Sequence, residues 1–278
     1  MSARGPGSIP VAIARLGFGD PARAHALLQD PAVADLIHSR EHIEEHGLAE
    51  ALSAVPDPDG ALLGLVRFME PVGADPALHG PVAAALGAPG PARDRLLAVL
   101  GSSAALGDHL VANPGHWRAV TEARPLTVAE RTERLVGAVS RPGEVPAVDV
   151  LRTAYREQLL GIAALDVTSG DPLETLPDTA SALADLAQAA LEAALVIARA
   201  EVGPDAARTR LAVIAMGKAG GCELNYISDV DVIFVAEPAE GVQEDVSTTV
   251  ATELATRLMR ICSASTAAGS LWQVDPAL

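Results

Sequence analysis

The stretch GKAGGCELNYISDVDVIF, residues 217–234, decides the fold. Glycines and a lysine precede a Ser-Asp-x-Asp sequence, which opens an apolar run. Residues two apart in a strand face the same side, so Asp229 and Asp231 are predicted to project together near the start of a strand over 230–237. Two adjacent carboxylates repel each other unless a cation joins them. The stretch therefore predicts a strand with a cation site at its beginning.

The sequence on both sides of this stretch predicts a small α/β core. Residues 211–217 (LAVIAMG) indicate a strand, 222–226 (CELNY) a single helical turn, and 270–275 (SLWQVD) a third strand. Between the last two strands, residues 243–262 predict an amphipathic helix. Its apolar stripe consists of Val246, Val250, Leu254, Leu258 and Ile261.

The sequence before the core predicts helices alone. Apolar residues recur at spacings of three and four in short stretches that proline and glycine separate. These stretches are 21–46, 59–70, 92–114 and 148–165. Asp178 or Thr179 is expected to cap the next helix, 181–202. We therefore predict an α-rich α+β chain, with a helical domain over 1–170 and a small α/β core over 171–278.

Composition and charge narrow the classes of function. The formal net charge of −16 repels polyphosphate backbones and anionic membranes, so neither nucleic acid nor a membrane is expected as a partner. No window of about 18 uncharged apolar residues is evident. Cys222 and Cys262 lie far apart without a Cys-x-x-Cys pattern, as is typical of a reducing cytosol. We expect a cytoplasmic protein.

The residues around the Ser-Asp-x-Asp sequence suit a metal and phosphate site. Mg²⁺ is usually held by one or two carboxylates together with substrate phosphates. Gly220 and Gly221 allow the backbone to approach a phosphate closely, and Lys218 adds a mobile positive charge. Asp275, on the third predicted strand, would bring a further carboxylate to Asp229 and Asp231.

This combination resembles the nucleotidyltransferase superfamily that includes DNA polymerase beta. More narrowly, MGKAGGCELNYISDVDVIF (216–234) resembles the signature MGKLGGRELNYxSDxDLIF of the bifunctional glutamine synthetase adenylyltransferase/adenylyl-removing enzymes. The resemblance extends to 55–70, 95–117 and 151–166 and so covers nearly the whole chain.

The resemblance implies the N-terminal, adenylyl-removing half of such an enzyme. Phosphate would attack the AMP carried by a tyrosine of glutamine synthetase and release ADP, while ATP and a PII-type signalling protein are further implied partners. The implied holders of Mg²⁺ or Mn²⁺ are Asp229, Asp231 and Asp275. The implied phosphate loop comprises Gly217, Lys218, Gly220, Gly221 and Ser228.

The chain departs from the family pattern in two places. Ala219 and Cys222 stand where Leu and Arg are usual, and the loss of the arginine removes a cation that could meet an acid or the substrate. The chain also ends at VDPAL, where the family continues with Arg-Pro. We therefore expect a fragment of a longer enzyme, truncated within its core.

Two other functions compete with this interpretation. His38, His42 and His46 are spaced four apart, and residues 42–46 (HIEEH) match the His-x-x-Glu-His pattern of inverted zinc peptidases, in which Glu45 would act as general base. A solvated helix face would show the same pattern. The third possibility is a helical docking module whose nucleotide fold is no longer catalytic.

Overall fold

The computed structural model describes residue 13 and residues 16–38 and 47–276. The chain divides into two compact units. Unit 1 comprises Met1–Arg124 with Ala163–Pro172, and unit 2 comprises Pro125–Ile162 with Leu173–Leu278. Units that are defined by packing need not coincide with domains, so the ranges 1–170 and 171–278 stay a prediction.

Unit 1 is built from short helices, as the sequence predicts. Aspartate followed by proline starts several of them: the Asp20, Asp57 and Asp75 side chains accept hydrogen bonds from backbone amides of the first turn, and proline occupies the first helical position. Leu62, Leu65 and other apolar residues of the central helix, α5, are buried. The helices are α2 Pro21–Leu28, α3 Pro31–His38, α4 Leu48–Ser53, α5 Pro58–Ala74, α6 Pro76–Gly87, α7 Pro91–Ser102, α8 Ala104–Ala112, η1 Pro114–His116 and α9 Trp117–Thr121.

Unit 2 contains longer helices. They are α10 Val128–Val139, α11 Ala147–Val167, of which residues up to Ile162 belong to this unit, α12 Pro172–Val202, η2 Gly203–Arg208, the short α13 Gly217–Gly220, and α14 Glu244–Ser263. Thr127 and Glu130 form a capping box at the start of α10. The predicted stripe of α14 faces the core: Val250, Leu254, Leu258 and Ile261 are buried, and Val246 is partly buried.

The predicted start of α12 is wrong. Asp178 and Thr179 do not cap this helix, because it begins at Pro172 and continues through Pro177. Pro172 is suited to the first helical position, where an N–H group would have no partner within the helix. Pro177 loses one intrahelical hydrogen bond without ending the helix.

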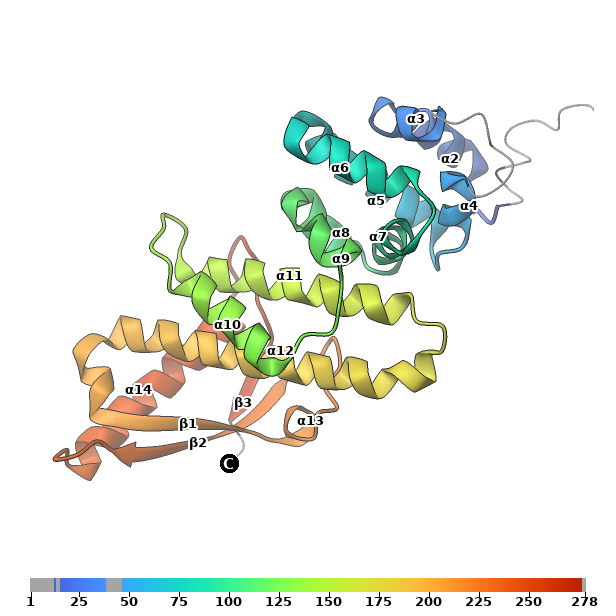
Figure 1. Ribbon diagram of the computed structural model, residues 1–278. Helices are drawn as coiled ribbons and strands as arrows, with labels where there is room; N and C mark the ends of the chain where they lie inside the picture. Colours follow the sequence, from blue (N-terminus) through green and yellow to red (C-terminus); the bar gives the residue numbers. More distant parts are fainter. Residues whose placement is uncertain (1–12, 14–15, 39–46, 277–278) are drawn as a thin grey trace, which may run out of the picture. The chain divides into compact units, whose positions relative to one another are not determined.

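The three predicted strands form one sheet in unit 2. β1 Thr209–Ala215 pairs antiparallel with β2 Val230–Pro238, and β2 pairs parallel with β3 Val274–Pro276. The parallel pair is joined through α14, which packs against β1 and β2. The long helices of the unit lie on one side of the sheet (Figure 1). Val230 and Val232 point into that buried layer.

The apolar character of α12 reflects its place in the core. By length and composition, the segment Pro172–Arg208 could cross a membrane, contrary to the expectation that no window comes close. However, 61% of its most apolar window is buried inside the protein. The buried residues are mostly alanine and leucine, including Leu186, Ala190 and Ala194. The apolar window is therefore explained by the burial of α12 in the core of unit 2.

Candidate metal and phosphate site

The structure brings the three predicted carboxylates together. Asp231 on β2 lies directly opposite Asp275 on β3, and Asp229 precedes β2 on the same face. One carboxylate oxygen of each residue lies within 4.8 Å of those of the other two. Asp229 and Asp275 are exposed and Asp231 is partly buried, so the cluster is open to solvent. Carboxylate oxygens at this spacing fit a hard divalent cation such as Mg²⁺ or Mn²⁺.

Gly217 lies against this cluster. Its φ of +51° is in the left-handed region, and a Cβ atom at this position would come within 2.3 Å of Oδ2 of Asp231. The Met216 amide donates to the backbone oxygen of Asp231 over 2.8 Å, which ties the turn to β2. Glycine is therefore required here both by the backbone conformation and by the space beside the carboxylate.

The helical turn falls on GKAG (217–220) and not on CELNY, so that prediction is wrong. Gly220 N–H donates to the Met216 carbonyl, and Gly221 N–H donates to the Gly217 carbonyl. A Cβ atom on Gly220 would lie 2.5 Å from the Ala215 carbonyl oxygen. Glycine thus allows the chain to turn back tightly at the end of β1, which places the helical turn earlier than the periodicity suggests. These two amides are used inside the turn, and the part of Gly220 and Gly221 in a phosphate loop stays a prediction.

Lys218 and Ser228 both precede the three aspartates in the sequence. Lys218 is the only lysine of the chain, and it is exposed. The Ser228 hydroxyl donates to Oδ1 of Asp229 over 3.4 Å, a long hydrogen bond. Cys222, which stands where the family pattern has arginine, is exposed with a φ of +57°. The contacts of Lys218 and Ser228 with phosphate remain predictions.

The face of the sheet that carries the carboxylates continues as an apolar surface, which the sequence reading did not identify. Ile214 on β1 pairs with Ile233 on β2, and these side chains are 46% and 38% exposed. Ile233 is two residues beyond Asp231 and therefore shares its face. The sequence signal that could have revealed this surface is the position of Ile233 and Val235, two and four residues beyond Asp231 in the same predicted strand.

The other candidate residues lie elsewhere. His42, Glu45 and His46 lie outside the described residues, and the side chain of His38 does too. In unit 1, Nε2 of His109 lies 3.0 Å from Nδ1 of His116. His109 lies in the last turn of α8 and His116 at the end of η1, so the contact joins two helix ends.

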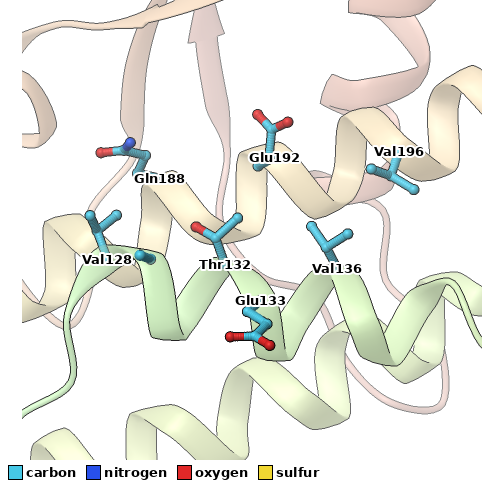
Figure 2. A pocket seen from close by; sticks show the side chains of 8 residues that line it. Val128, Thr132, Glu133, Val136, Gln188, Glu192 and Val196 are labelled. Carbon is cyan, nitrogen blue, oxygen red and sulfur yellow. The ribbon is translucent and has the colours of Figure 1, made fainter.

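A separate groove runs between α10 and α12 in unit 2, and Figure 2 shows its lining residues. Half of its lining residues are apolar and half are polar, two of these being glutamates, and none of the three aspartates contributes to it. The lining residues are Val128, Ala129, Thr132, Glu133, Val136, Gln188, Glu192 and Val196.

The described residues thus form a helical region and a small α/β core, with three carboxylates and a glycine turn at one end of its mixed sheet. Residues 93–278 match the family glutamate-ammonia ligase adenylyltransferase, glutamate-ammonia ligase being another name for glutamine synthetase. The chain belongs to this family.

Relatives in Streptomyces and Mycobacterium species are similar over nearly the whole chain. A bifunctional glutamine synthetase adenylyltransferase/adenylyl-removing enzyme of Streptomyces avermitilis is 47% identical over 94% of this chain. Enzymes of the same description from Streptomyces coelicolor and Mycobacterium avium are 46% and 42% identical over 94% and 96% of it. The chain spans 25% of the length of each of these three relatives.

Proposed function

We propose that this chain carries the adenylyl-removing site of an enzyme that regulates glutamine synthetase. Family membership supports the link to glutamine synthetase, since the relatives are named for it. The observation that carries the proposal is the gathering of Asp229, Asp231 and Asp275 within 4.8 Å beside the glycine turn. A cytoplasmic location and a PII-type partner belong to the same proposal.

The proposed reaction exchanges one phosphate ester for a phosphoanhydride. An oxygen of inorganic phosphate attacks the phosphorus of tyrosine-bound AMP, the bond from phosphorus to the tyrosine oxygen breaks, and that oxygen takes a proton. The products are ADP and unmodified tyrosine. Asp229, Asp231 and Asp275 would hold Mg²⁺ or Mn²⁺, which when bound offsets the negative charge of the phosphates.

The chain's own residues would orient the reactants. Lys218 provides positive charge at the turn, and Gly217 keeps the space beside Asp231 free of a side chain. Asp231 and Asp275 lie on strands and Asp229 directly precedes one, and strands are more rigid supports than loops. Positioning and charge stabilisation, rather than a nucleophilic side chain, would supply most of the rate acceleration.

The test is an assay of the purified chain with adenylylated glutamine synthetase, inorganic phosphate and Mg²⁺ or Mn²⁺. We expect ADP to form, and we expect the rate to fall at least about 100-fold in Asp231→Asn. The reverse assay, with ATP and unmodified glutamine synthetase, distinguishes the two activities: AMP incorporation without ADP release would reassign the site to adenylylation.

A measurement of nucleotide binding distinguishes an inactive enzyme from a docking module. By titration calorimetry, ADP with Mn²⁺ should bind the chain and bind more weakly to Asp229→Asn and Asp231→Asn. If both variants bind as the unchanged chain does, the carboxylates are not the site. A chain that captures glutamine synthetase without binding nucleotide would instead be a docking module.

A further inference from the structure

The carboxylate of Asp275 depends on a short strand and on the segment that leads to it. β3 has three residues, and it pairs with β2 only over Val230–Val232. Residues 264–273, here called the connecting segment, join the end of α14 to β3. β3 is shorter than a typical strand and has few ladder hydrogen bonds to hold it. The contacts of the connecting segment therefore help to fix the position of Asp275.

Arg152 of α11 binds the start of the connecting segment. Its side chain is fully buried. Its guanidinium donates to the Ile261 carbonyl over 3.0 Å, to the Ala264 carbonyl, and to the Thr266 hydroxyl over 3.0 Å. Asp149, one turn earlier on α11, forms an ion pair with Arg152 at 3.3 Å and accepts from the Thr266 hydroxyl over 2.5 Å.

Arg156, one turn after Arg152, binds the middle of the connecting segment. It donates to the Ala268 carbonyl, and over 3.1 Å to the Ser270 carbonyl. Gly269 lies between these carbonyls with a φ of +81°, and a Cβ atom there would lie 2.3 Å from Nη2 of Arg156. Glycine thus allows the backbone to lie directly against the guanidinium.

Tyr155 completes this face of α11 and reaches the end of the connecting segment. The Trp272 indole N–H donates to the Tyr155 hydroxyl over 3.3 Å. Two residues later, the Val274 side chain is buried and β3 begins. Asp149, Arg152, Tyr155 and Arg156 follow the three- and four-residue spacing of one helix face, and we call them the α11 face.

We propose that Arg152 and Arg156 are positioning residues for the candidate metal site: by holding the connecting segment they place Asp275 beside Asp229 and Asp231. The inference rests on the proposed function in assigning a metal to the carboxylates. Its structural part, that the α11 face fixes β3, stands without it.

Arginine suits this task for a physical reason. The last carbonyls of α14 have no partners within the helix, and they carry the partial negative charge of its C-terminus. A guanidinium presents several donors in one plane, so a single side chain satisfies more than one carbonyl. Lysine at position 156 would keep the charge but would lose the fixed geometry for two carbonyls.

The test measures two quantities separately in the full chain: hydrogen exchange in the connecting segment and affinity for Mn²⁺. Arg156→Ala is the chosen variant, because Arg156 is only partly buried whereas Arg152 is wholly buried. Hydrogen exchange of the amides in 264–276 should quicken about tenfold or more, as expected when charge-assisted hydrogen bonds are lost. Mn²⁺ affinity, measured by electron paramagnetic resonance, should fall about 10–100-fold. Arg156→Lys should have an exchange rate and an Mn²⁺ affinity between those of the unsubstituted chain and Arg156→Ala.

Arg257→Ala is the matched control. Arg257 is an arginine on α14 that is also neither fully buried nor fully exposed, and its ion pairs are with Glu201 and Glu253. It should leave exchange in 264–276 and Mn²⁺ affinity unchanged. Unaltered exchange in Arg156→Ala would overturn the inference, as would faster exchange with unaltered Mn²⁺ affinity. An unchanged chain that binds no Mn²⁺ would refute the proposed function, and the exchange rates would still decide whether Arg156 fixes β3.

Discussion

At the scale of single residues, Gly217 is a position where backbone conformation and the neighbouring carboxylate both act against a side chain. Alanine there would meet two penalties, a left-handed backbone with φ of +51° and a Cβ atom 2.3 Å from Oδ2 of Asp231. We expect Gly217→Ala to lower the free energy of unfolding by about 1–3 kcal/mol. We also expect weaker Mn²⁺ binding, because Asp231 must move. Urea unfolding and Mn²⁺ titration measure the two effects.

Gly241 provides the control for this substitution. Its φ is +77°, but a Cβ atom there would meet nothing within 4 Å. Gly241→Ala should therefore lose stability through the backbone alone and keep full Mn²⁺ affinity. Equal losses of Mn²⁺ affinity in both variants would show that Asp231 does not depend on the space that Gly217 leaves.

At the scale of elements, α12 gives a test of why a helix passes through a proline. Pro177 is exposed, lies inside α12 and cannot donate an intrahelical hydrogen bond. Pro177→Ala should raise the free energy of unfolding by about 1 kcal/mol, which is less than the full helix-interior penalty because the variant's unfolded chain gains entropy. Pro172→Ala, at the first helical position, should give no gain. If Pro177→Ala is neutral or destabilising, the helix does not run continuously through this residue.

The sequence predicts the elements whose signals are local. The stripe from Val250 to Ile261 and the alternation around Asp231 follow directly from periodicity, and the structure confirms both. Helix starts were less predictable: Asp178 looks like a cap, yet α12 begins at Pro172, and its first turns are largely exposed. Periodicity alone therefore places a helix better than it places its ends.

The sequence predicts the three aspartates of the candidate site, but it does not predict the contacts that hold Asp275 in place. The position of Asp275 beside Asp231 follows from reading residues 270–275 as a neighbouring strand. The contacts of Arg152 with Ala264 and Thr266 join residues more than 100 positions apart, and no local pattern encodes them. Long-range hydrogen bonds of this kind require coordinates.

At the scale of the whole molecule, buried titratable groups in unit 2 should make the free energy of unfolding fall as the pH becomes alkaline. Burial raises the pKa of the Cys262 thiol from 9.0 to about 12, with a smaller opposing effect of Arg152. Burial also raises the pKa of the Tyr155 hydroxyl. Because the thiol keeps its proton longer in the folded state than in the unfolded chain, its contribution to stability is complete below pH 9 and is lost as pH rises towards 12.

We therefore expect the free energy of unfolding to fall steeply between about pH 9 and pH 12, by up to about 4 kcal/mol from Cys262, the equivalent of its three-unit shift. Urea unfolding followed by circular dichroism under reducing conditions measures this slope. Cys262→Ala should flatten it, at the cost of a small cavity, whereas Cys222→Ala should not, because Cys222 is exposed. The same slope in Cys262→Ala as in the unchanged chain would assign the alkaline loss to other groups, with Tyr155 the first to test by Tyr155→Phe.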